Sequence, residues 1–111
     1  MVEYNIFDEH IVHYLDDQGE ELEVVIVFEF GPDMDVDLGE GDLLVRRTGR
    51  ARFVLNGEEY AVTASGEGPV QLVHRLMTLC GSLLLHTAEA LELHLYQHET
   101  GDVGEPLDLF K

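Results

Sequence analysis

The sequence predicts an α+β fold, in which a single antiparallel sheet of about six strands curls around one main helix at about residues 69–80. Three observations support this prediction. Several segments alternate apolar and polar residues with the period of a strand, one segment has helical periodicity, and Asn56-Gly57 is a dipeptide preferred in two-residue hairpin turns. At 111 residues, we expect the chain to form one domain, residues 1–111, without a separate linker.

The first thirty residues predict three strands. Residues 2–7 and 10–15 show strand alternation, weakly in the first segment, and residues 16–19 have the composition of a turn. Residues 22–30, LEVVIVFEF, have the strongest strand pattern in the chain. Because two valines make the second face of this strand half apolar, we expect it to lie centrally, partly covered on both sides.

The middle of the chain predicts an acidic segment followed by a meander. Residues 33–38 alternate carboxylates with apolar side chains, as a half-buried edge strand or an extended loop does. Residues 43–47 and 50–55 predict two strands joined by a turn at Thr48-Gly49. Residues 59–64 follow the Asn56-Gly57 turn as the next strand.

Residues 68–81, GPVQLVHRLMTLCG, predict the helix. Pro69 suits the first helical position, where its missing N–H is no loss, and Gly81 suits a left-handed C-terminal cap. Between them, a wide apolar face and a narrow polar stripe follow the helical period. The other elements must therefore cover this helix on most sides.

Beyond the helix, the pattern supports two interpretations. Residues 82–87 and 91–97 favour a hairpin, because the second segment alternates strictly between leucine and polar residues. A second helix over residues 87–98 is the alternative. The last apolar residues, Leu107, Leu109 and Phe110, are suited to dock on the body of the domain.

The chain is strongly acidic. It has 23 Asp and Glu residues against 6 Lys and Arg, a formal net charge of -17, and its first 42 residues contain 14 of the acids and no Lys or Arg. A charge of this size makes free nucleic acid and anionic membranes poor partners and a basic protein a suitable one. No apolar run approaches the ~20 residues of a membrane span and no leader opens the chain, so we expect a cytoplasmic protein.

One group of acids is the candidate partner-binding face. It comprises Asp33, Asp35, Asp37, Glu40 and Asp42. The spacing of its first three members is that of a calcium loop, but Leu38 and Leu44 stand where an EF-hand needs glycine and glutamate. A solvated strand face is therefore the preferred interpretation, and no cofactor is expected.

Four arginines interrupt the acidic sequence. They are Arg46, Arg47, Arg50 and Arg52. In one interpretation they pair across strands with acids such as Glu58, Glu59 or the group at residues 33–42. In the other they form a patch that binds an anion or an acidic patch on a partner. A third possibility is self-association as a homodimer, in which the arginines meet the acidic face of a second copy.

The sequence contains 6 histidines and one cysteine. Glu92, His94 and His98 are weak metal candidates, because residues four apart on a strand lie roughly 13 Å apart, too far to share one ion. His10 and His13 are expected on opposite faces of a strand, at the surface. Cys80 is expected to be a small buried apolar residue. No nucleophile motif or phosphate loop is present, so no enzymatic activity is expected.

These observations favour a non-catalytic acidic protein that engages a basic protein partner. Nuclease-inhibiting immunity proteins and nucleic-acid-mimicking inhibitors use the same physics, and this chain is similar to them in charge and size only. One alternative is adaptation to high salt, in which the acidity serves solubility. Another is a small-molecule or metal-binding protein with a pocket between sheet and helix.

Overall fold

A computed structural model describes residues 3–39 and 42–110, with only the backbone described between residues 34 and 45. The main elements are five long strands and one long helix, followed by two short strands and a 3₁₀ helix. In chain order they are β1 (Asn5–Leu15), β2 (Glu21–Phe30), β3 (Met34–Gly39), β4 (Asp42–Leu55), β5 (Glu58–Gly66), α1 (Pro69–Ala90), β6 (Tyr96–Gln97), β7 (Gly101–Asp102) and η1 (Pro106–Phe110).

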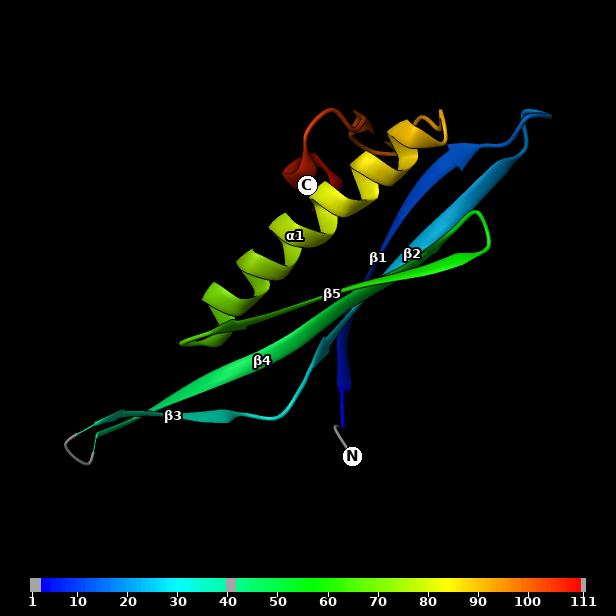
Figure 1. Ribbon diagram of the computed structural model, residues 1–111. Helices are drawn as coiled ribbons and strands as arrows, with labels where there is room; N and C mark the ends of the chain where they lie inside the picture. Colours follow the sequence, from blue (N-terminus) through cyan, green and yellow to red (C-terminus); the bar gives the residue numbers. More distant parts are fainter. Residues whose placement is uncertain (1–2, 40–41, 111) are drawn as a thin grey trace.

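The main sheet has six antiparallel strands in the order β5-β4-β2-β1-β6-β7, and α1 packs on one of its faces (Figure 1). A seventh strand, β3, pairs with the outer part of β4, where its register is shifted by one residue from that of β2, since Phe30 pairs with Gly49 but Met34 with Arg46. This pairing forms the two-stranded arm that reaches beyond α1 in Figure 1. The predicted α+β class, with about six strands against one main helix, is confirmed.

The core lies between α1 and the helix-facing side of the sheet. Strand β2 contributes Val24, Ile26 and Phe28, alternate residues that are all buried. The helix buries one stripe against them, which includes Leu72, Leu76, Cys80, Leu84 and Ala88. Full burial of an aliphatic side chain contributes roughly 1.5–3 kcal/mol, so this layer is the main source of stability.

The helix begins where expected but runs farther. Gly68 is its N-cap and Pro69 its first residue, yet it ends at Ala90 instead of near residue 80. The predicted cap at Gly81 is wrong, because Gly81 lies inside the helix where η1 crosses it. A Cβ at this position would come within 2.6 Å of the Pro106 carbonyl oxygen. The expected docking is confirmed for Leu109, which is fully buried, and for Phe110, which packs against the core, whereas Leu107 is exposed.

The longer helix also overturns the hairpin predicted for residues 82–98. Residues 82–90 are helical, and only Tyr96 and Gln97 pair as a strand, with β1 and β7. Strict alternation of leucine is thus compatible with a loop in which Leu95 is buried, Leu93 is partly buried and Leu91 is exposed.

Two other boundaries differ from the prediction. Strand β4 continues through Thr48-Gly49 without a turn, because Gly49 lies beneath the helix, where a Cβ would be 3.0 Å from Leu76 Cδ1. Residues 2–7 and 10–15 belong largely to one strand, β1, with a register shift between Ile6 and Asp8. The turn at Asn56-Gly57 is confirmed, with φ values of 52° and 83°.

Candidate functional site

The main sheet opens between β2 and β4 at the end where its two hairpins turn (Figure 1). The two strands pair from Phe30–Gly49 to Val27–Arg52. Beyond that point, β2 stays paired only with β1, and β4 stays paired only with β5. A groove of about 450 Å³ occupies the opening. We call it the hairpin-end groove.

The hairpin-end groove has an apolar floor and acidic edges. Val25 and Val54 supply exposed apolar surface, with 36% and 52% of their area open to solvent. Glu23 on β2 and Glu59 on β5 line opposite sides, and both are exposed. Exposed acids of the adjoining β1–β2 turn, including Asp17 and Glu20, extend the negative surface beyond the groove.

The acidic face predicted at residues 33–42 falls mostly outside the described side chains. Asp33 is exposed. Asp35, Asp37, Glu40 and Asp42 lie outside the described residues or have undescribed side chains, although the backbone around them forms β3 and the start of β4.

The arginines contribute to a network within the protein. Arg50 Nε and Arg52 Nε donate to Glu29 Oε1 at 3.0 and 2.8 Å, on the sheet face turned away from α1. Glu29 is the only buried carboxylate among the described side chains. The hydrogen bond from Arg50, with that from Arg52, lowers the pKa of Glu29 below its ordinary value of 4.5 despite the opposing effect of burial.

The other two predicted arginines lie farther along β4. Arg46 Nε donates to Ser65 Oγ at 3.3 Å, and Arg47 is exposed. Cross-strand pairing of arginine with acid, one of the two interpretations, is therefore present for Arg50 and Arg52. The acid is Glu29 on β2, whereas the acids predicted from the sequence were Glu58, Glu59 and those at residues 33–42.

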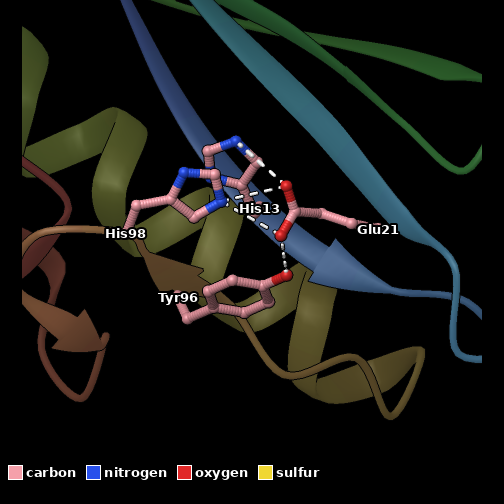
Figure 2. A network of polar contacts seen from close by, with 4 residues as sticks. All are labelled: His13, Glu21, Tyr96 and His98. Carbon is pink, nitrogen blue, oxygen red and sulfur yellow. Dashed lines mark hydrogen bonds and ion pairs between the residues drawn. The ribbon is translucent and has the colours of Figure 1, made fainter.

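A second polar cluster gathers around Glu21, at the first residue of β2 (Figure 2). His98 Nε2 lies 2.9 and 3.0 Å from the two carboxylate oxygens, and Tyr96 donates to Glu21 Oε2 at 2.5 Å. His13 Nε2 lies 3.8 Å from Glu21 Oε1, and its ring stacks on that of His98 with centroids 3.9 Å apart. We call these four residues the histidine cluster.

Hydrogen bonding in the histidine cluster moves two pKa values in opposite directions. The Tyr96 hydroxyl and then His98 lower the pKa of Glu21. The same bond to Glu21 raises the pKa of Tyr96 to about 12, because ionisation of the phenol would place two negative charges together.

Of the three weak metal candidates, only His98 belongs to this cluster. His94 Nε2 contacts Asp102 Oδ1 at 2.8 Å, and Glu92 adopts a φ of 58° just after α1. His13 and Glu21 were not predicted as partners of His98 from the sequence. His13 does face away from His10 as expected, but it is buried and not at the surface. A hairpin of β1 and β2 with strand alternation brings His13 near Glu21, and this could have been inferred from the sequence. The pairing of His13 with Tyr96 could not be inferred from it.

Cys80 is buried in α1 against the sheet, as expected for a small apolar residue. Burial raises the pKa of its thiol to about 12. The thiolate, which is the reactive form of cysteine, is therefore scarce near neutral pH.

Comparisons of the chain with protein-family models, with curated proteins and with solved structures each gave no match. Within the described residues, no helix combines the length and the apolar character that a membrane span requires.

Proposed function

We propose that this protein is a non-catalytic binding protein that engages a basic protein partner through the hairpin-end groove. One observation carries the proposal: on a chain with a net charge of -17, an apolar groove is bordered by exposed carboxylates on both sides. Apolar contact supplies affinity, whereas complementary charge steers the encounter and selects the partner.

Because the groove lies between two separating strands, we expect an extended segment of the partner to occupy it. Val25 and Val54 offer contact to aliphatic side chains, while Glu23 and Glu59 offer carboxylates to Lys or Arg. Arg52 also lines the groove, and its Nε donates to Glu29, which reduces its repulsion of an incoming cation. A protein of this kind suits the role of an inhibitor that covers a basic surface shaped for phosphate, as immunity proteins and nucleic-acid mimics do.

Binding to synthetic peptides tests the proposal. An extended peptide that alternates Lys with Leu should bind, and its Glu-for-Lys counterpart should not. Affinity for the Lys peptide should fall as salt rises, because the charges on the groove edges are exposed. The double variant E23Q/E59Q should bind the Lys peptide several-fold more weakly than the unaltered protein.

The matched control is E67Q/E105Q, which removes the same charge from exposed acids outside the groove. Equal losses in both double variants would mean that net charge alone attracts the peptide, and the groove would be rejected as the site. Affinity that does not respond to salt would count against a charge-selected partner altogether. Sedimentation of the protein alone measures whether it self-associates through Arg46 and Arg47. A monomer in this experiment favours binding to a different protein.

A further inference from the structure

We propose that His13, Glu21 and His98 form a binding site for Zn²⁺ or a divalent ion of the same ligand preference. Their ligand atoms all lie within 4.8 Å of one another. They come from β1, from β2 and from the residue after β6, so the fold and not local sequence assembles them (Figure 2). The inference is independent of the proposed partner binding, which concerns the neighbouring groove.

His13 supplies the observation that points to a ligand. It is buried, with 8% of its area exposed, and its Nδ1 has no hydrogen-bond partner among the described residues. Its Nε2 is aimed at Glu21 but lies 3.8 Å away, beyond hydrogen-bonding distance. A metal ion at Nε2 would give this buried ring a strong partner on the side that faces Glu21, while Nδ1 would stay unpaired.

The set of ligands suits zinc. Two imidazoles and one carboxylate are the protein ligands of many zinc sites, in which a water molecule completes the tetrahedron. Imidazole ligands disfavour Ca²⁺ and Mg²⁺, which prefer oxygen ligands. The negative charge of the whole chain also concentrates cations near this surface.

Binding of one ion requires the His98 ring to turn. Tetrahedral ligands at zinc distances lie about 3.4 Å apart, between the present 2.9 and 3.8 Å separations from Glu21 Oε1. The parallel rings, 11° apart, must open so that both Nε2 lone pairs meet one ion. His98 can make that turn, because 57% of its side chain is exposed, whereas packing holds His13 in place.

Tyr96 supports the carboxylate from outside the ligand set. Its hydroxyl donates to Glu21 Oε2, while His98 Nε2 contacts both oxygens and His13 Nε2 is nearest to Oε1. Hydrogen bonds of this kind orient metal ligands, and their removal typically weakens metal binding about 10–100-fold.

Calorimetric titration of the tag-free, chelator-treated protein with ZnCl₂, in excess Mg²⁺, tests the inference. We expect one Zn²⁺ per chain. H98A should weaken binding by at least about tenfold and Y96F by about tenfold. The matched control is H94A, because His94 is also an exposed histidine that contacts a carboxylate, and it should leave the affinity unchanged. H98A and H94A alter exposed residues, so their folds can be verified by circular dichroism.

Nuclear magnetic resonance of the histidine rings gives a second readout. Zn²⁺ should shift the ring signals of His13 and His98 and leave those of His74, His86 and His94 in place. The inference is overturned if the protein takes up no Zn²⁺ at millimolar concentration. It is equally overturned if H98A and H94A bind Zn²⁺ as tightly as the unaltered protein, since the ion would then be held by surface acids in general.

Discussion

Arg52 on β4 donates to Glu29 on β2 across 2.8 Å, next to the last residue pair that joins the two strands, Val27–Arg52. Arg50 donates to the same carboxylate oxygen, so one buried acid holds two cations on a chain that is otherwise acidic. The hairpin-end groove opens directly beyond this network. The Glu29 network thus lies beside the point at which β2 and β4 separate.

Replacing Glu29 by Gln should destabilise the protein. The change leaves Arg50 and Arg52, each about one third exposed, without their anionic partner. We expect the free energy of unfolding to fall by roughly 1–3 kcal/mol, measured by urea denaturation at pH 7. E59Q, at an exposed position on β5, should stay within about 0.5 kcal/mol of the unaltered protein. Similar values for both variants would show that the network adds no stability.

The contribution of Glu29 should also depend on pH. Because folding lowers its pKa below 4.5, its stabilisation is fully present above the ordinary pKa and is lost as pH falls through the folded value. Protonation of the many other carboxylates also changes stability, so the informative quantity is the difference between the unaltered protein and E29Q. Urea titrations from pH 7 to pH 3 should show this difference shrinking below about pH 4.5. A constant difference would contradict the lowered pKa.

Local patterns predicted the elements that depend on local chemistry. The alternation in β2 and the Asn56-Gly57 turn were both correct, because strand faces and positive φ angles are properties of a few adjacent residues. Gly49 and Gly81 were misinterpreted for the opposite reason. A glycine can mark a turn or a close approach, and the atoms that approach these two belong to distant segments, α1 and η1.

The candidate sites show the same limit. His98 was predicted as a metal candidate, but its partners follow from the pairing of β6 with β1. No periodic pattern in the sequence predicts that pairing. The hairpin-end groove depends on where the pairing of β2 with β4 ends, and neither strand changes its pattern at that point. Charge predicted a class of partner, and only the fold could suggest a place for it.

Gly81 provides a test of the helix–η1 contact. In an open helix, replacing Gly by Ala stabilises by about 0.8–1 kcal/mol. Here the new methyl group would lie 2.6 Å from Pro106 O, so η1 must move, and we expect a net loss of about 1–3 kcal/mol in urea denaturation. G104A is the control, because its added Cβ would meet only an ordinary contact at 3.8 Å. A stabilised G81A would place η1 elsewhere.

Cys80 should be unreactive in the folded protein. With its thiol pKa raised from 9.0 to about 12, the thiolate fraction at pH 8 is about 10³-fold lower than in an unfolded chain. A disulfide reagent that gives a coloured product should therefore react at once with Cys80 of the protein unfolded in urea. It should react very slowly with Cys80 of the folded protein. The native rate should rise with urea in parallel with unfolding. Rapid reaction of the folded protein would contradict the packing of α1 on the sheet.

Salt separates partner binding from salt adaptation as the reason for the acidity. Like charges that total -17 oppose the compact state, and screening them stabilises it, so the melting temperature should rise with NaCl. Each 1 kcal/mol gained corresponds to about 4 °C for a chain of this size. Burial of the apolar core between α1 and the sheet does not depend on screening by salt, so it preserves the fold at low salt. We therefore expect a cooperative thermal transition even at low ionic strength. A chain that folds only in concentrated salt would instead be adapted to that medium, and its carboxylates would no longer argue for a basic partner.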